Sequence, residues 1–405
     1  MVEVINEKDQ LEYYLLNGRI ITPHRVLPSG GLHISGSRIK RVFSMSEANI
    51  PSGSKVIDVH GNIIAPGFID LHLHGGGNAD VMDGTEEALV TIAKVHAAGG
   101  ATAIVPSTLT SSFEDLVRAL AAFASVKTRP LEGARLLGLH LEGPYFAQSQ
   151  RGAQDPRYIR YPNKDEYLTI LDHNRDIIRV SAAPELPGAL ELGRELRKRG
   201  ILASIGHSDA SYDEVVAAIE AGYKHVTHLY SAMSGVKRIN CIRVPGVIES
   251  ALLLDELTVE VIADGKHLPG PLLKLIYKCK GPDRIALCTD AIRAASMPDG
   301  EYVLGSGGDG QKIVVYDGVA WLADRSAFAG SVATANQLVR NMVELADVPL
   351  AAAIKMATLT PARILGIDDK FGSLDPGKEA DIAILRNDYS VKATIVAGRF
   401  VYKNL

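Results

Sequence analysis

Residues 68–77 have the sequence FIDLHLHGGG and place His72 and His74 one residue apart at the end of an apolar run. In a β-strand, residues i and i+2 point to the same side, so both imidazoles should converge on one point. The three glycines that follow allow the backbone to turn sharply away. An isolated pair of this kind also suits an ordinary strand end, so its meaning depends on which other polar residues the fold brings beside it.

Outward from this stretch, the chain alternates between short apolar runs and helical segments. Helical apolar spacing, with capping residues and a closing glycine, is found for example at 85–100, 187–200 and 208–222. The apolar runs that separate such segments are 68–74, 101–107, 135–143, 177–185, 201–207, 225–233, 258–267 and 284–290. Eight strands that alternate with helices are typical of a (β/α)8 barrel of the TIM type, which we expect over residues 65–367.

Two β-rich segments flank this α/β region. Residues 11–64 contain short β-like runs punctuated by glycine and Asn-Gly, which indicates hairpins, and residues 372–402 have the same character. We therefore expect 1–64 and 368–405 to pair into one small β-sandwich domain. Within the barrel, a glycine-rich insertion is expected at 292–328, followed by closing helices at 331–366.

Composition argues against several classes of function. Of the 405 residues, 46% are hydrophobic, and the formal net charge is −4 with both signs interspersed. This balance gives no electrostatic basis for binding nucleic acid or an anionic membrane surface. No apolar run approaches the ~20 residues of a membrane helix. The three cysteines suit reduced intracellular thiols, and residues 1–19 lack signal-peptide features, so we expect a cytoplasmic protein.

Polar side chains gather at the carboxyl ends of the expected strands, where (β/α)8 barrels carry their chemistry. These residues are His72, His74, Glu142, His207, His228, His267 and Asp290. Neutral imidazoles and carboxylates are ligands that suit Zn, Fe, Mn or Co. Each residue alone has an ordinary explanation, as a hydrogen-bonded histidine or a helix cap. Seven of them on one rim indicate a metal site.

Several motifs resemble a known family in sequence order. APGFIDLHLHG (65–75) and GSLDPGKEADIAIL (372–385) resemble the amidohydrolase superfamily. More closely, GLHLEGPYF, ASIGHSDA, HVTHLYSAMS, IADGKHL and LCTDAI resemble the N-acetylglucosamine-6-phosphate deacetylases, and the similarity covers about residues 15–400. The resemblance implies a metal-dependent hydrolase that removes the N-acetyl group of an amino-sugar phosphate in amino-sugar catabolism.

The resemblance also assigns the metal ligands and the acid–base group. It implies a divalent metal, one or two ions, with the ligands Glu142, His207, His228 and, for a second ion bridged by Glu142, His72 and His74. Asp290 would be the general base, which takes a proton from water and passes it to the leaving amine. His267 would bind and polarise the substrate. The expected strand 177–185 lacks the bridging lysine of the dihydroorotase–hydantoinase branch.

The substrate contacts are likewise implied by the resemblance. Arg243, in VKRINCIRVPG (236–246), matches the family's phosphate-binding arginine, and bidentate arginine suits that role. The residues expected around the sugar are Ala153, Gln154, Ser231, Ala232, Phe328, Ala329 and Gly330. In the family a phosphate contact comes from a neighbouring subunit, which implies a homodimer, and Gln154 matches a residue that reaches across it.

Three alternatives stay open. Ser231 stands where the family commonly has asparagine, so the substrate is either N-acetylglucosamine 6-phosphate or its galacto epimer. Another amidohydrolase, acting on a cyclic amide or an N-acyl amino acid, is a second alternative, and a non-enzymatic scaffold is a third. Arg243 and the missing lysine favour the deacetylase. His140 and Cys288 are interpreted as structural, and the remaining histidines, His24 and His225 included, have no assigned role.

Overall fold

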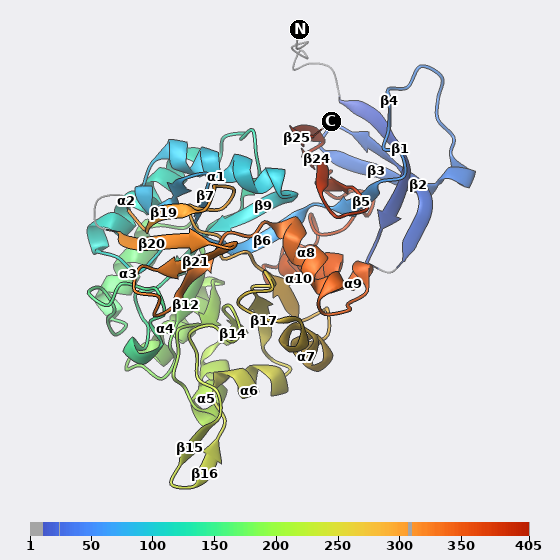
Figure 1. Ribbon diagram of the computed structural model, residues 1–405. Coiled ribbons are helices and arrows are strands. Elements are labelled where there is room, and N and C mark those ends of the chain that lie inside the picture. The colour runs from blue at the N-terminus through green and yellow to red at the C-terminus, as the bar shows by residue number, and fades with distance from the viewer. Residues whose placement is uncertain (1–10, 24, 307–309, 405) are drawn as a thin grey trace.

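The computed structural model describes residues 11–23, 25–306 and 310–404 (Figure 1). The expectations for residues 1–10, including the one about a signal peptide, and the one for His24 lie outside this part of the chain. None of the helices within the described ranges is both long and apolar enough to span a bilayer.

The predicted alternation of strands and helices is confirmed in the central region, where each of the eight expected runs contains a strand. These strands are β6 (Phe68–Leu73), β9 (Ala101–Pro106), β11 (Leu139–Glu142), β12 (Ile177–Ala182), β13 (Leu202–Ile205), β14 (Tyr223–Val226), β17 (Thr258–Val261) and β18 (Ile285–Leu287). Consecutive strands pair in parallel from β11 to β18, and β6 pairs in parallel with β9. Parallel bridges join Ser107 to His140 and Leu73 to Ala291, so the pairing returns from β18 to β6.

Two of these strands differ from the predicted runs. The run 135–143 is divided into β10 (Arg135–Leu136) and β11, and between them Gly138 passes so close to β12 that a Cβ there would lie 2.6 Å from Ile178. The run 225–233 contains a strand only up to Val226. Beyond it the backbone turns through positive φ at His228, Tyr230 and Ala232, which a strand does not allow.

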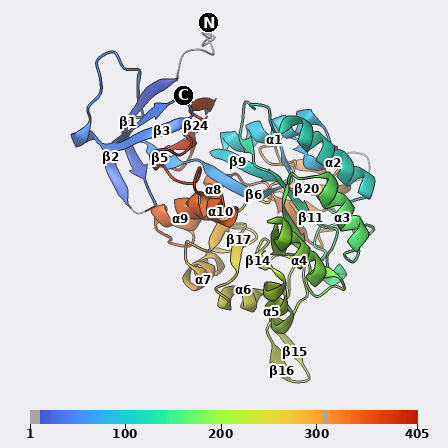
Figure 2. The ribbon, with the colours of Figure 1, turned by 180° about the vertical axis from the view of Figure 1, so that it is seen from behind.

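Helices lie outside these strands (Figure 2). They are α1 (Glu86–Ala98), α2 (Phe113–Val126), α3 (Lys164–His173), α4 (Ala189–Arg199), α5 (Tyr212–Ala221), α6 (Val247–Leu253), α7 (Gly270–Lys280), α8 (Ala335–Glu344), α9 (Leu350–Ala357) and α10 (Leu359–Ile364). The expected helices at 85–100, 187–200 and 208–222 are confirmed by α1, α4 and α5. Their ends follow the capping signals: Thr85 caps α1 through the Ala88 amide, and α5 ends at Gly222 with φ 115°.

The two chain ends form one sheet, as predicted. Its strands are β1 (Glu12–Ile21), β2 (Val26–Ser35), β3 (Arg38–Ser44), β4 (Val56–Asp58), β5 (Ile63–Pro66), β23 (Ile382–Leu385), β24 (Val391–Val396) and β25 (Arg399–Lys403). The antiparallel pair β5 and β23, with Ile382 opposite Pro66, joins the N-terminal to the C-terminal strands. Side chains of this sheet, including Tyr13, Leu32 and Ile382, form an apolar cluster separate from that of the central region. Since β5 leads directly into β6, the sheet anchors the strand that carries His72.

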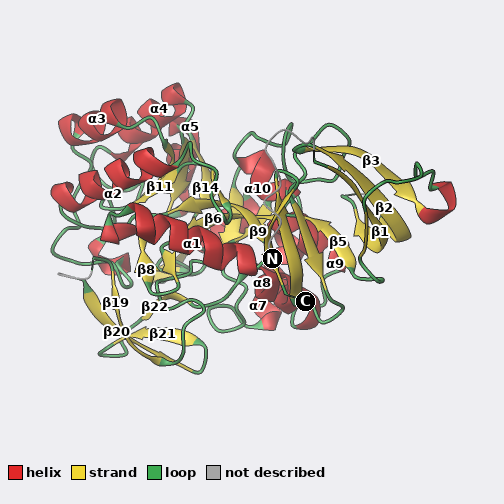
Figure 3. Cartoon of the chain, turned by 90° about the horizontal axis from the view of Figure 1, so that it is seen from above, coloured by secondary structure: helices red, strands yellow, loops and turns green. Residues whose placement is uncertain are grey.

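Shorter elements surround the central strands. The expected insertion contains an antiparallel sheet of β19 (Gly300–Leu304), β20 (Gln311–Tyr316), β21 (Val319–Leu322) and β22 (Phe328–Ser331). Figure 3 shows this sheet on the opposite side of the molecule from the sheet of the chain ends. A further hairpin, β15 (Lys237–Ile239) and β16 (Ile242–Val244), projects beyond α5 and α6 (Figure 1). The remaining elements are β7 (Gly75–Gly76), β8 (Ala79–Asp80) and the 3₁₀ turns η1 (Met45–Glu47), η2 (Val81–Asp83) and η3 (Gln148–Gln150).

Candidate active site

The carboxylate of Glu142, the last residue of β11, lies among four imidazoles. Its Oε1 is 3.1 Å from Nε2 of His228, 3.3 Å from Nε2 of His72 and 3.5 Å from Nε2 of His207. Its Oε2 is 3.1 Å from Nε2 of His74. All five side chains are buried. The expected convergence of residues from β6, β11, β13 and β14 is therefore present in the fold.

Backbone conformation at the strand ends aims three of these side chains. His207, His228 and Asp290 closely follow β13, β14 and β18, and their φ angles are 48°, 30° and 47°. Residues with a Cβ rarely adopt positive φ, and each such position costs on the order of 1–3 kcal/mol unless its surroundings enforce it. Strain of this kind is typical of functional sites, where it directs a side chain that ordinary geometry would turn away.

The hydrogen bonds of His74 and His207 indicate which ring nitrogen carries the proton. Nδ1 of His74 lies 3.2 Å from the carbonyl oxygen of Ser107, and Nδ1 of His207 lies 2.9 Å from that of Gln150. A carbonyl only accepts, so both Nδ1 atoms carry the proton and donate it. In the neutral form of each ring, which is the form that binds a metal, Nε2 is unprotonated and faces Glu142.

Two overlapping groups of donor atoms can each hold a metal ion: His72 with His74 and Glu142, and Glu142 with His207 and His228. The donor separations of 3.1–3.5 Å match the ~3.3–3.6 Å between tetrahedral ligands bonded at ~2.0–2.2 Å. Nε2 of His72 is buried without a hydrogen-bond partner among the described residues. Such an atom is expected where a cation completes the site, so the residues present fit a divalent metal.

The pKa shifts of the clustered histidines and of Glu142 indicate that this cluster favours positive charge. Burial by itself lowers the pKa of the buried histidines, but the nearby carboxylates of Glu142 and Asp290 raise the pKa of His74 to about 9 and that of His72 well above its usual value. Burial raises the pKa of Glu142, yet the facing imidazoles, His72 first, hold it well below its usual range. In the absence of a metal, protons therefore supply the charge that the carboxylates require.

Asp290 and His267 stand at the edge of this cluster. An oxygen of Asp290 lies 3.2 Å from Nε2 of His74 and 3.5 Å from Nε2 of His72. Nδ1 of His267 lies 2.7 Å from Oδ2 of Asp264 and donates to it, which leaves Nε2 as the nitrogen that can contact a ligand. The ring of His267 also packs against Phe328, with centroids 4.8 Å apart.

A cavity of about 370 Å³ opens onto this cluster. That volume is in the range of sites for small ligands. Its wall includes His74, Glu142, His207, His228, Asp290 and His267. Of the residues expected around a sugar, it also includes Ala153, Gln154, Ser231, Ala232, Phe328, Ala329 and Gly330. Gly330, with φ 75°, passes so close to Asp290 that a Cβ would lie 2.8 Å from its carbonyl oxygen.

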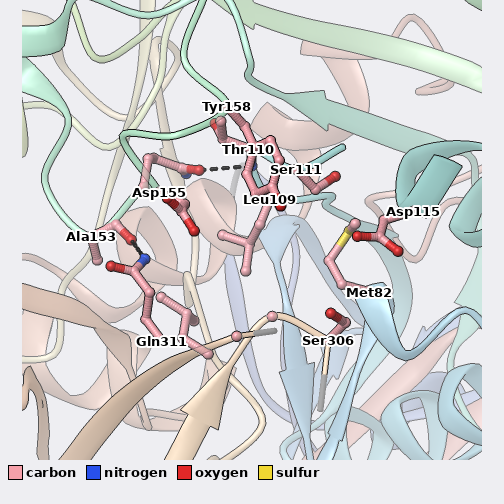
Figure 4. A pocket seen from close by; sticks show the side chains of 14 residues that line it. Met82, Leu109, Thr110, Ser111, Asp115, Ala153, Asp155, Tyr158, Ser306 and Gln311 are labelled. Atoms are coloured by element: carbon pink, nitrogen blue, oxygen red, sulfur yellow. Dashed lines mark hydrogen bonds between the residues drawn. The ribbon is translucent and has the colours of Figure 1, made fainter. Parts of the chain in front are cut away.

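Gln154 forms two hydrogen bonds within its own chain, while its role across a homodimer stays a prediction. Its Nε2 donates to Oε2 of Glu142 at 2.9 Å, and its Oε1 accepts from the Thr110 amide at 2.8 Å. In a small neighbouring cavity, Nε2 of Gln311 donates to the carbonyl oxygen of Ala153 (Figure 4). Gln154 therefore fixes the orientation of the central carboxylate.

Arg243 is the one expected substrate residue that the fold does not bring to the cavity. It lies exposed on β16, in the hairpin that projects beyond α5 and α6 (Figure 1), and is not among the described residues that line the cavity. A contact between Arg243 and a ligand in the cavity of the same chain is thus not supported. Neighbouring Lys237 forms an ion pair with Asp209 at 2.5 Å.

Sequence reasoning missed two buried charges below the cluster, Arg179 in β12 and Glu260 in β17. Both side chains are fully buried and form an ion pair, with Nη1 and Oε2 2.6 Å apart. Charged residues inside apolar strand runs, IIRVSA and TVEV, were the available signal. His140 is bonded to Ser107 and Ser181 through its two nitrogens, in line with its structural interpretation.

The parallel strands and the imidazoles around a carboxylate on a cavity wall define the class of site: one at the carboxyl ends of the strands that can hold divalent metal ions. The chain belongs to the amidohydrolase family, whose model matches residues 63–401.

Proteins with similar sequences indicate which members of this family the chain resembles. An N-acetylglucosamine-6-phosphate deacetylase of Vibrio furnissii is 38% identical over 84% of this chain and 83% of its own. An N-acetylgalactosamine-6-phosphate deacetylase of Escherichia coli O157:H7 is 35% identical over 86% of this chain and 90% of its own. Among solved structures, a mutant of the N-acetyl-D-glucosamine-6-phosphate deacetylase of Mycobacterium smegmatis, in complex with N-acetyl-D-glucosamine-6-phosphate, superposes with a TM-score of 0.88. It is 33% identical, and the match covers 97% of this chain and 100% of that one.

Proposed function

We propose that this protein hydrolyses the N-acetyl group of N-acetylglucosamine 6-phosphate, with glucosamine 6-phosphate and acetate as products. The observation that carries the proposal is the position of Glu142, which lies within 3.5 Å of four imidazoles and lines a cavity together with Asp290. The names of the relatives, at 38% identity over most of the chain, support the choice of an amino-sugar phosphate.

The architecture belongs to the same proposal. A closed (β/α)8 barrel over residues 65–367 is supported by parallel pairings that return from β18 to β6. A small β-sandwich domain of 1–64 and 368–405 is supported by the sheet that both chain ends share and by its separate apolar cluster. In such a barrel, residues at the carboxyl ends of the strands carry the chemistry, which is where the cluster lies.

Five side chains would hold the metal: Glu142, His207 and His228 for one ion, and His72, His74 and Glu142 for a second. When bound, a divalent ion makes water more acidic and polarises a carbonyl oxygen. Gln154 keeps Glu142 in the orientation that faces both groups. The donor set of imidazoles and carboxylates suits Zn, Fe, Mn or Co.

Asp290 is the proposed general base. Its carboxylate accepts a proton from the attacking water and returns that proton to the nitrogen of the departing amine. In the site without a metal, burial raises the pKa of Asp290, but the imidazoles of His72 and His74 outweigh this effect and keep the pKa below its usual value. His267, fixed by Asp264, contacts the acetyl oxygen of the substrate through Nε2.

The phosphate of the substrate needs a cationic partner, and the described residues that line the cavity include no arginine or lysine. Arg243 is exposed on a projecting hairpin, and we place it in the cavity of a neighbouring subunit of a homodimer. This arrangement is supported by the exposed arginine and by the family resemblance of its motif. Sedimentation analysis tests it: a monomer at working concentration would remove Arg243 from phosphate binding.

The galacto epimer is a second candidate substrate. Ser231 lines the cavity, and the relative from Escherichia coli O157:H7, at 35% identity, is named for N-acetylgalactosamine 6-phosphate. An acetate-release assay on both epimers, with metal quantified in the same preparation, separates the two. Greater turnover of a dihydropyrimidine or an N-acyl amino acid than of either epimer would contradict the proposed function.

A further inference from the structure

We propose that Glu260 and Arg179 are positioning residues that fix His72 in the tautomer able to bind metal. The inference rests on the proposed metal site, and it concerns the layer of the molecule below the cavity. Glu260 lies in β17 and Arg179 in β12, and both side chains are 0% exposed. Neither of them lines the cavity, so they act on the reaction only through another residue.

The contact between Glu260 and His72 decides which ring nitrogen carries the proton. Nδ1 of His72 lies 2.7 Å from Oε1 of Glu260. An ionised carboxylate only accepts, so Nδ1 is the protonated nitrogen and donates to it. Nε2 of the neutral ring then has a free lone pair, and this is the buried atom that lacks a hydrogen-bond partner among the described residues and lies 3.3 Å from Glu142.

Arg179 keeps Glu260 ionised, so that Glu260 accepts a hydrogen bond from His72 and does not donate one. Its Nη1 donates to Oε2 of Glu260 at 2.6 Å, and its Nη2 donates to Oε1 at 2.9 Å. Both carboxylate oxygens are therefore engaged by a cation, and neither is free to carry a proton toward His72. Arg179 is itself held by Ser204 and Thr227 at 3.0 and 2.8 Å, so the pair is rigid.

Glu260 also supports the second group of ligands. Its Oε1 accepts from the backbone amide of His228 at 3.1 Å. His228 has a φ of 30°, a conformation that needs enforcement by its surroundings. One carboxylate thus orients the ring of His72 and holds the backbone of His228, which belong to the two metal-binding groups.

The same geometry excludes a deeper metal site. His72, Glu260 and Cys288 are close enough to hold an ion. However, the guanidinium of Arg179 already occupies both oxygens of Glu260, and a second cation there would face it at close range. Glu260 is accordingly a partner of a metal ligand rather than a ligand itself.

The test is a calorimetric titration of chelator-stripped protein with Zn²⁺, comparing wild type with Glu260→Gln. Glutamine keeps the shape and loses the charge, and loss of such a partner typically weakens metal affinity ~10–100-fold. We expect this weaker affinity for one of the bound Zn²⁺ ions, namely the ion whose binding is also lost in His72→Ala. Asp381→Asn is the matched control, because Asp381 is a buried carboxylate that faces Arg135 and contacts no metal-binding residue. It should bind Zn²⁺ as the wild type does.

A second readout separates positioning from stability. In the metal-free wild type, at a pH high enough to leave a single proton on the ring, long-range ¹H–¹⁵N spectra of ¹⁵N-histidine should show His72, assigned by its absence in His72→Ala, as the Nδ1–H tautomer. In Glu260→Gln the Nε2–H form should gain population. If Glu260→Gln does not fold, the neutral pair Glu260→Gln with Arg179→Gln takes its place.

Unchanged Zn²⁺ affinity together with an unchanged tautomer would overturn the inference. Failure of the wild type to bind any metal would instead overturn the proposed function. In that case the tautomer spectrum still tests the role of Glu260, so the two failures are distinguishable.

Discussion

Substitution of Asp290 by asparagine is the sharpest test of the proposed acid–base group. Asparagine keeps the shape of the side chain and removes its charge and its ability to accept a proton. The backbone at Asp290 has a φ of 47°, a region that asparagine tolerates better than most residues, so the local fold should persist. The backbone amide of residue 290, which donates to the carbonyl oxygen of His72 at 2.9 Å, should keep this bond in the variant.

The expected fall in kcat for Asp290→Asn follows from the position of Asp290. Its oxygen lies 3.2 Å from His74, at the edge of the ligand cluster, while Glu142, His207 and His228 remain intact in the variant. Metal bound by those three residues should therefore stay. Proton transfer by a positioned group contributes ~10²–10⁴-fold to turnover, which corresponds to ~2.7–5.4 kcal/mol. We expect kcat to fall by that factor, with KM within about threefold of wild type.

The assay is acetate release from N-acetylglucosamine 6-phosphate, with the metal content of each preparation measured by mass spectrometry. A lower metal content would mean that Asp290 is mainly a ligand. Turnover within about threefold of wild type, at equal metal content, would refute its role as the general base.

Three further perturbations have defined outcomes. Replacing His72 and His74 by alanine should lower the metal content from two ions to one, because Glu142, His207 and His228 form their own group; an unchanged ratio in mass spectrometry would leave the pair without this role. Arg243→Ala should raise KM for the phosphorylated sugar far more than for the unphosphorylated one, and an equal effect would argue against phosphate binding. Burial raises the pKa of Asp381 to about 6, against the lowering effect of Arg135, so the native state holds this proton more tightly than the unfolded chain. The contribution of Asp381 to the free energy of unfolding should therefore decrease as pH rises from about 4 to about 6, by ~3 kcal/mol at most. Urea titrations of wild type and Asp381→Asn should differ by this pH-dependent contribution, and identical pH profiles would contradict it.

The sequence was sufficient for most of the fold because its signals are local. Alternating apolar runs and capped helices predicted β6 to β18, and the spacing of His72 and His74 predicted a shared direction. The positive φ angles at His207 and His228 could not be predicted, since they depend on contacts made elsewhere in the fold. The one at His228 falls within the predicted run 225–233, in which the strand ends at Val226.

The contacts that were missed join residues far apart in the sequence. Arg179 and Glu260 are separated by 81 positions, and each stands alone in an apolar run, so neither has a local pattern that indicates its partner. The hydrogen bonds of the Gln154 amide to Glu142 and Thr110 likewise have no local pattern that indicates them. Arg243 lies on a hairpin whose direction no local pattern specifies.

The most direct test of the account is anomalous diffraction from crystals of the active enzyme at the absorption edges of zinc, iron, manganese and cobalt. We predict a peak within bonding distance of Oε1 of Glu142 and of Nε2 of both His207 and His228. A fully active preparation with no peak at that position would contradict the metal site on which the proposed hydrolysis depends.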